Sequence, residues 1–234
     1  MVTRTRRPAP ETAPPNDQKE PYHKGNVRAQ LLAAAERILE TESVEDVTAR
    51  RLCREVGVTS ANFYNHFPSL DFLLLEIAAA SFERRARERE RLLRRGLPRE
   101  DAMVALAQNT VEFGMKHSQL FRIMFGEIKD TSINPAYVEK SDHGFGMLVE
   151  LIYGEDLYRG DDLVWSHQHC PKAYAFMSFI WGMSYMFSRG LIANPGGTKA
   201  SRLAFVEEMT RAYVEGLGDK ARRSVTRAPV RKAP

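Results

Sequence analysis

The stretch from residue 48 to residue 67 constrains the fold of this chain most, because it predicts two short helices separated by a glycine. Thr48 precedes the first helix and can cap it, since its hydroxyl accepts a free backbone N–H of the first turn. Gly57 stands where that helix must end, and glycine readily adopts the left-handed conformation that such an end needs. Phe63 and Phe67 lie four residues apart on the second helix, which predicts one buried apolar face.

The opposite face of the second helix is polar. Thr59 or Ser60 can cap this helix, and Pro68 ends the unit because the residue before a proline avoids helical geometry. Two short helices around a glycine turn, the second with a free polar face, indicate a helix-turn-helix whose second helix enters a DNA major groove. The alternative is an ordinary helical hairpin. The residues expected to point outward are Ser60, Ala61, Asn62, Tyr64, Asn65 and His66.

The residues of this unit resemble the DNA-binding signature of the TetR family (TetR/AcrR) of bacterial repressors, over roughly residues 25 to 85. The resemblance implies an all-α homodimeric transcriptional regulator with an N-terminal three-helix DNA-binding domain and a C-terminal helical domain that binds a ligand and dimerises. The family usually has a phosphate-contacting lysine where this chain has Leu70, which puts one backbone contact in question. The matching features are Thr48, Val56-Gly57-Val58, Tyr64 and His66-Phe67-Pro68-Ser69.

The first helix of the unit carries three arginines, Arg50, Arg51 and Arg54. In a helix-turn-helix the first helix crosses the sugar-phosphate backbone, so arginines on it position the protein and do not specify sequence. Acidic neighbours, among them Glu45 and Glu55, cancel part of their charge. We therefore expect a geometric contact with phosphates and not a strong general attraction.

The second helix is expected to read the DNA sequence. Asn62 is the best candidate for a base edge, because an amide pairs bidentately with adenine, and Ala61 can meet a thymine methyl group. Tyr64 and His66 are expected at phosphates, as the resemblance also implies; the alternative for His66 is a capping or surface histidine. The full set of expected DNA contacts is Thr48, Arg50, Arg51, Arg54, Thr59, Ser60, Ala61, Asn62, Tyr64, Asn65 and His66.

The chain divides by composition into four segments. The first and last are rich in charge and poor in large apolar residues, which predicts disorder. The first segment has a net charge of +2 and the last a net charge of +5, whereas the whole chain has a net charge of only +4. The part of the chain between them is therefore acidic. Basic tails can attract DNA or simply keep disordered ends soluble. The segments are a tail at 1–24, the DNA-binding domain at 25–85, a regulatory and dimerisation domain at 86–218, and a tail at 219–234.

The larger domain is rich in methionine and aromatic residues. Such side chains suit a cavity for varied apolar ligands, while the alternative is an ordinary core or dimer interface. The segment Phe179–Met183 stands where a TetR subgroup has a Trp-His-Gly motif, but here Trp181 precedes Gly182 directly. A small hydrophobic effector is the expected ligand, and the long helix from about residue 70 to 95 would carry its effect to the DNA-binding unit. The candidate lining is Phe113, Phe121, Met124, Phe125, Phe176, Ile180, Trp181 and Tyr185.

A competing hypothesis is a metal- or thiol-sensing regulator that uses His167, His169 and Cys170, with His143 as a further ligand. No phosphate loop, nucleophile elbow or paired carboxylate indicates an enzyme, and no cofactor is expected. Two cysteines make no disulfide framework, and the chain has neither an export signal core nor a long apolar run. The expected setting is therefore the cytoplasm, away from membranes.

Overall fold

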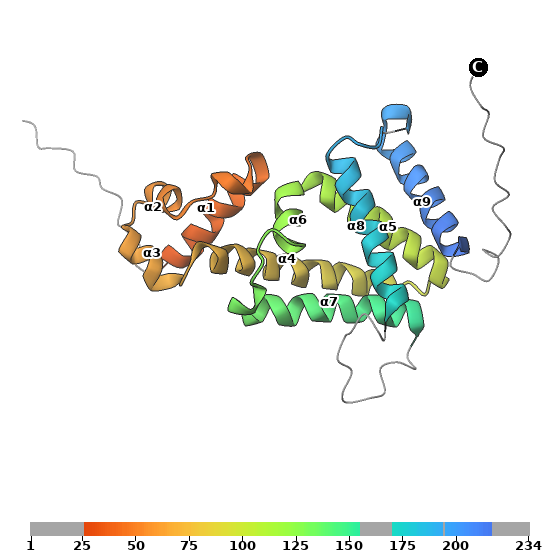
Figure 1. Ribbon diagram of the computed structural model, residues 1–234, viewed down its shortest axis with the longest axis horizontal. Coiled ribbons are helices and arrows are strands. Elements are labelled where there is room, and N and C mark those ends of the chain that lie inside the picture. The colour runs from red at the N-terminus through yellow and green to blue at the C-terminus, as the bar shows by residue number, and fades with distance from the viewer. Residues whose placement is uncertain (1–25, 155–169, 194, 217–234) are drawn as a thin grey trace, which may run out of the picture.

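The computed structural model describes residues 26–154, 170–193 and 195–216, and over these residues the chain forms nine α-helices and no β-strand (Figure 1). The all-α prediction is confirmed. Three short 3-10 helices accompany the α-helices, namely η1 (Val44–Asp46), η2 (Thr131–Ile133) and η4 (Pro195–Gly197). The α-helices are α1 (Val27–Thr41), α2 (Ala49–Val56), α3 (Ser60–His66), α4 (Leu70–Leu93), α5 (Arg99–Lys116), α6 (Ser118–Met124), α7 (Pro135–Tyr153), α8 (Pro171–Ser188) and α9 (Lys199–Gly216).

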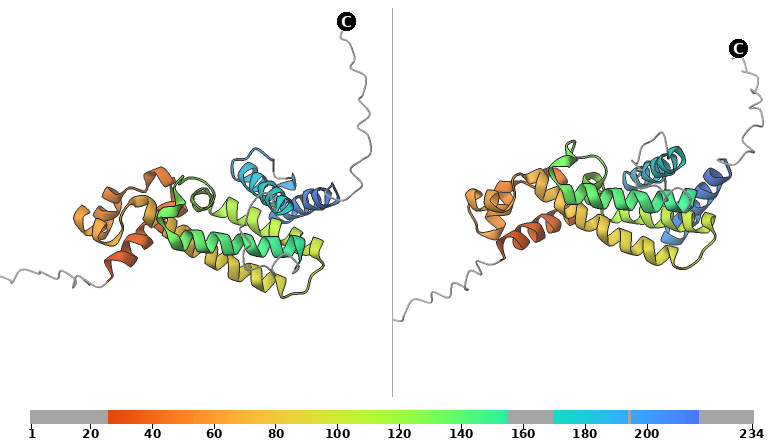
Figure 2. Two further views of the ribbon diagram at one scale, coloured as in Figure 1. Left: turned by 60° about the horizontal axis from the view of Figure 1, so that its bottom comes forward. Right: turned by 90° about the horizontal axis from the view of Figure 1, so that it is seen from below.

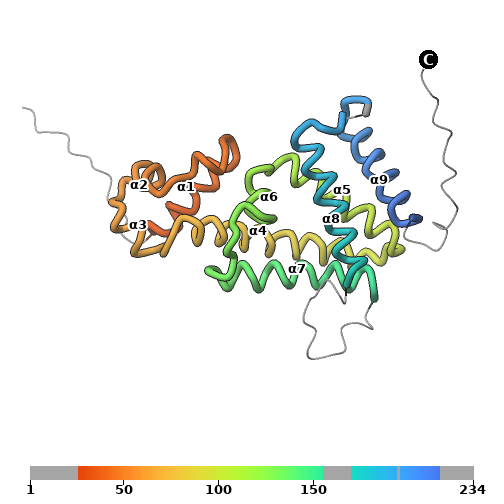
Figure 3. Tube along the Cα trace, in the orientation of Figure 1, coloured from red at the N-terminus to blue at the C-terminus, as the bar shows by residue number. Residues whose placement is uncertain are grey.

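Helix α4 joins a small N-terminal bundle to a larger C-terminal one, as the tube drawing shows (Figure 3). It has 24 residues and is about 36 Å long. Its first half packs on α1, and α7 runs beside it in both further views (Figure 2). Helices α2 and α3 lie at one end of the molecule and α9 lies at the other. One rigid helix therefore spans the distance between the two bundles.

Two apolar cores stabilise the two bundles. The first is built from α1, α2, α3 and the start of α4, with Leu31, Leu52 and Phe63 completely buried. It continues into α6, because Ile123 and Met124 belong to the same cluster. The second core lies between α5, α7, α8 and α9. The N-terminal bundle is thus packed directly against one helix of the larger domain.

Helix α8 ends at Ser188, because Gly190 adopts a positive φ of 68° that a helix cannot continue through. Helix α4 ends at Leu93, two residues before the end predicted from the sequence. No helix among the residues placed here is long and apolar enough to cross a membrane.

Helices α5 and α8 approach each other closely at Gly114. A Cβ atom added there would lie 2.9 Å from Cβ of Ser184 and 3.3 Å from the Phe121 ring. In α7, by contrast, a Cβ at Gly144 would meet Phe82 at 3.8 Å, which is an ordinary contact. Glycine at position 114 is therefore required by packing and not by backbone conformation.

We predict that Gly114→Ala lowers the free energy of unfolding by about 1–3 kcal/mol, because the added methyl group overpacks the α5–α8 contact. Gly144→Ala is the control, and it should leave stability unchanged or raise it by up to about 1 kcal/mol through its better helix propensity. Urea denaturation followed by circular dichroism measures both. Equal effects of the two substitutions would contradict the close approach.

Candidate DNA-binding surface and ligand cavity

Three side-chain caps fix the ends of α2, α3 and α4. The Thr48 hydroxyl accepts the Arg51 N–H at 3.2 Å, and the Thr59 hydroxyl accepts the Asn62 N–H at 3.2 Å. The Ser69 hydroxyl does the same for α4. Gly57 ends α2 with φ 75°, as the turn requires. Thr59, and not Ser60, is thus the cap of α3.

Helix α3 stands on a buried aromatic platform formed by Phe63 and Phe67. Both rings are completely buried, with centroids 5.7 Å apart. Tyr64 is 57% exposed, and its ring packs edge-on against Phe63 with the centroids 5.2 Å apart. Of the other expected DNA contacts on α3, Ser60, Ala61 and Asn65 are exposed, while Asn62 and His66 are half-buried. The polar face predicted from the sequence therefore faces outward.

The three arginines of α2 differ in what they contact. Arg51 forms a bidentate ion pair with Glu42, at 2.6 and 2.8 Å, and donates to Glu55 at 3.0 Å. These carboxylates raise the pKa of Arg51 and hold its guanidinium within the domain. Arg50 and Arg54 are exposed and form no ion pair with any described residue. Arg50 and Arg54 are therefore available to contact a phosphate, whereas Arg51 is held by two carboxylates.

Leu70, where the resemblance predicts a lysine, is half-buried and packs against the N-terminal core. Arg28, near the start of α1, pairs with Glu76 and lies 5.0 Å from the centroid of the Phe67 ring. Arg28 thus links α1 to α4 across the platform. The position of Leu70 serves packing in this chain.

A cavity of about 340 Å³ lies between α4, α6, α7 and α8. Met124, Phe125, Ile180 and Trp181 line it, so the structure brings four of the predicted ligand residues together. The Phe125 and Trp181 rings are in contact, with centroids 4.1 Å apart. The aromatic part of the lining is Phe82, Phe125, Tyr137, Phe145, Tyr174 and Trp181.

The other four predicted ligand residues do not line this cavity. Phe176 is completely buried in the second core, and Phe121 is buried against Phe125. Phe113 packs with its ring against the Arg85 guanidinium. Tyr185 is 53% exposed on the outer face of α8. We therefore remove these four from the candidate lining, since an apolar helix does not reveal which of its faces borders a hollow.

Two arginines of α4, Arg85 and Arg89, line the cavity, although the closely spaced charges of both signs in residues 83–95 are typical of a solvated helix face. Burial lowers the pKa of each to about 10. A sequence signal existed, because Phe82, Arg85, Ala86 and Arg89 are spaced as one inward helix face. This spacing is hard to recognise in the sequence, because residues 83–95 carry many charged side chains on every face of the helix.

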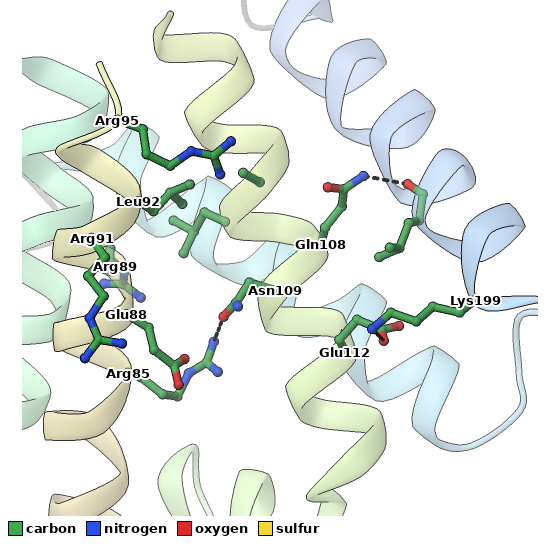
Figure 4. A pocket seen from close by; sticks show the side chains of 13 residues that line it. Arg85, Glu88, Arg89, Arg91, Leu92, Arg95, Gln108, Asn109, Glu112 and Lys199 are labelled. Carbon is green, nitrogen blue, oxygen red and sulfur yellow. Dashed lines mark hydrogen bonds and ion pairs between the residues drawn. The ribbon is translucent and has the colours of Figure 1, made fainter. Parts of the chain in front are cut away.

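A second hollow of about 460 Å³ opens between α4, α5 and α9 (Figure 4). Figure 4 shows Arg85 reaching from α4 to Asn109 on α5, with a hydrogen bond of 3.2 Å. The Glu112 carboxylate pairs with Lys199 at 3.1 Å, and Gln108 donates to the carbonyl of Leu203 at 2.9 Å. Much of its polar lining is therefore already engaged within the chain.

The metal hypothesis rests on residues that are mostly outside the described part of the chain, namely His167 and His169. Cys170 is completely buried, and burial raises the pKa of its thiol, which disfavours the thiolate that binds metals. His143 is exposed on α7. Within residues 26–154, 170–193 and 195–216, no three His, Cys, Asp or Glu side chains form a group that could hold a metal.

Helix α6 connects the cavity to the N-terminal bundle. The Gln119 side chain accepts the Val44 backbone N–H at 3.1 Å, and Arg122 pairs with Glu45 at 2.7 Å. The Arg122 and Ser43 hydrogen bonds lower the pKa of Glu45 to about 2. Met124 belongs to the N-terminal core and also lines the cavity. A displacement of α6 by a ligand would therefore press directly on this bundle.

Residues 31–77 match the family described as bacterial regulatory proteins, tetR family. A protein of unknown function from Rhodococcus sp. RHA1 has a similar structure (TM-score 0.62, 23% identity), covering 83% of this chain and 98% of its own. A TetR transcriptional regulator from the same source also matches (TM-score 0.53, 10% identity, coverage 81% and 98%). So does the transcriptional regulator FadR from Bacillus subtilis, in complex with stearoyl-CoA (TM-score 0.53, 10% identity, coverage 78% and 96%). No curated protein matches in sequence.

We predict that Thr59→Ala lowers the free energy of unfolding by about 1 kcal/mol, because α3 loses the cap on its first turn. Thr41→Ala is the control: that hydroxyl donates to a carbonyl of its own exposed helix end, so the change should stay within about 0.5 kcal/mol. Chemical denaturation measures both variants. A Thr59 effect no larger than the Thr41 effect would show that the cap is not needed.

Proposed function

We propose that the protein is a repressor, released from a palindromic operator by a small hydrophobic effector, because residues 31–77 match the tetR family and a TetR transcriptional regulator has a similar fold over 81% of this chain. We also propose that the chain is a ligand-responsive DNA-binding transcriptional regulator and not an enzyme. The proposed setting is the cytoplasm.

The polar face of α3 is the single observation that carries the proposal. It stands outward on the Phe63–Phe67 platform, and Ala61 and Ser60 are small enough to let the helix approach base edges. Helix α3 has no arginine or lysine, so hydrogen bonding by Asn62 and not general charge would give sequence preference. Arg50, Arg54 and Tyr64 flank it as phosphate contacts.

A homodimer is proposed through α8 and α9. Tyr185 and Met186 are exposed on α8 by 53% and 41%, and Leu191 beyond it by 65%. Helix α9 buries only Val206 and Thr210 of its 18 residues in the described chain. We propose that these exposed apolar side chains form the contact between two copies, which would present two α3 helices to one palindrome.

The effector is proposed to act through α6 and α4. The cavity is lined by Met124 of α6, by Phe125 directly after it and by the second half of α4, and both helices also contribute to the N-terminal core. A ligand changes DNA affinity only to the extent that it binds two shapes of the protein differently. The FadR neighbour is in complex with stearoyl-CoA, whose acyl chain is long and apolar, and this supports the proposal of a hydrophobic effector.

The DNA-binding proposal predicts that Asn62→Ala loses sequence preference while the protein stays folded. Selection from a random DNA pool, with the wild type and with Asn62→Ala, measures this directly. The wild type should enrich an inverted repeat, and the variant should enrich it weakly or lose one base position, since a bidentate base contact contributes about 1–3 kcal/mol of discrimination. Tyr64→Phe is the matched comparison and should weaken binding to all sequences alike. An identical consensus for wild type and Asn62→Ala would contradict the reading role.

The dimer proposal predicts that Met186→Glu shifts the protein toward monomer, because a charge would be buried in the α8 contact. Ser132→Glu adds the same charge to an exposed site on η2 and should leave the association state unchanged. Sedimentation velocity at several concentrations distinguishes the two. A Met186→Glu variant that sediments as the wild type does would move the interface elsewhere.

A further inference from the structure

Arg85 and Arg89 share the inner face of α4, where each borders both the cavity of about 340 Å³ and the neighbouring hollow of about 460 Å³. Arg85 and Arg89 are one helical turn apart, and each helps to line the same hollow. Arg85 donates to Asn109 at 3.2 Å and to the Thr110 hydroxyl at 3.4 Å, both neutral acceptors. Arg89 donates to the carbonyl of Gly144, while its Nε atom is buried and has no hydrogen-bond partner.

Neither guanidinium forms an ion pair with a described carboxylate. Asp142 also lines the cavity and Glu88 is the acidic neighbour of Arg85, but neither pairs with Arg85 or Arg89 within hydrogen-bonding distance. Other arginines of α4, such as Arg87 and Arg94, pair with a glutamate one turn away. Arg84 also pairs with Glu36, at 4.0 Å, so several arginines of the exposed face have a carboxylate partner, whereas Arg85 and Arg89 have none among the described residues.

An uncompensated charge in a largely desolvated place destabilises a protein, and two such charges at i and i+4 repel each other. Desolvation is the main reason that the pKa of each arginine falls, and the charge of Arg85 adds to it at Arg89. A bound anion would remove both penalties at once. A guanidinium also binds a carboxylate in a specific bidentate geometry.

Most of the other side chains that line the cavity are aromatic or aliphatic, and Thr110, Thr131, Ser141 and Asp142 are the polar ones. Phe125 and Trp181 form one wall, and Phe145 and Tyr174, with ring centroids 4.6 Å apart, form another. The cavity therefore has a cationic end on α4 and an aromatic body toward α8. A ligand that matches both ends has a single anionic group and an apolar chain or ring.

We propose that the effector is an amphiphilic organic carboxylate, whose carboxylate group binds Arg85 and Arg89 and whose apolar body packs on Phe125 and Trp181. This inference rests on the proposed function and makes its effector class more specific. A bound carboxylate would also accept a hydrogen bond from the buried Nε of Arg89, which has no other partner. An uncharged alkane or alcohol of the same size would leave both guanidinium groups without an anion.

Three probes with the same ten-carbon chain test the head group: decanoate, 1-decanol and decyltrimethylammonium. The chain has two tryptophans, so Trp165→Phe leaves Trp181 in the cavity wall as the fluorescent reporter. Titration in this background, below the aggregation range of each probe, gives three dissociation constants. We expect decanoate to bind about 10- to 100-fold more tightly than decanol, and the cation to bind more weakly still.

Arg89→Gln and Arg85→Gln should each weaken decanoate binding about 10-fold or more and leave decanol binding nearly unchanged. Arg87→Gln is the matched control on the exposed face of the same helix and should change neither. Circular dichroism reports whether each variant folds; if one does not, the head-group comparison in the reporter protein and the other arginine variant decide the question.

Equal affinity for the three probes, or an equal loss in Arg87→Gln and Arg89→Gln, would overturn the proposal. DNA binding without any probe is measured separately. A protein that prefers decanoate but binds no selected DNA would refute the regulator proposal and leave the carboxylate site standing. A protein that binds DNA but shows no preference for the anion would refute the carboxylate site alone.

Discussion

The burial of Phe63 and Phe67 beneath α3 is the interaction on which the rest of this structure depends. Both rings are inaccessible to water and pack in a core that also holds Leu31 and Leu52. Removal of a buried phenylalanine side chain costs about 3–5 kcal/mol, a large share of the stability of a small bundle. Because Phe67 is followed within three residues by the start of α4, the platform also joins the DNA-binding surface to the longest helix. The outward face of α3 is therefore set by what lies under it.

The same arrangement explains how two distant surfaces could influence each other. Helix α4 begins at the platform and carries Arg85 and Arg89 into the cavity, while α6 contributes Met124 to the N-terminal core and to the cavity alike. The Arg122–Glu45 ion pair adds a polar contact between α6 and the N-terminal bundle. A change of shape at the cavity thus has two physical routes to α3, one along a rigid helix and one through shared packing.

The DNA-binding unit could be predicted from sequence because its determinants are local. Thr48, Gly57 and Thr59 act within a few residues of their own positions, and the Phe63–Phe67 spacing is set by the helical period. The cavity could be predicted only in part. The burial of Arg85 and Arg89 depends on α5 and α7, which are separate elements of the chain, and the exposure of Tyr185 depends on which face of an apolar helix remains uncovered.

The central claim is that the outer face of α3 touches DNA, and hydroxyl-radical footprinting of the protein, read by mass spectrometry, measures that contact at a single side chain. Tyr64 is 57% exposed in the free chain and should be modified readily. On addition of selected DNA, the account predicts strong protection of Tyr64, with no protection of exposed Ile133 on η2. Unchanged modification of Tyr64 under conditions in which the DNA is fully bound would contradict it.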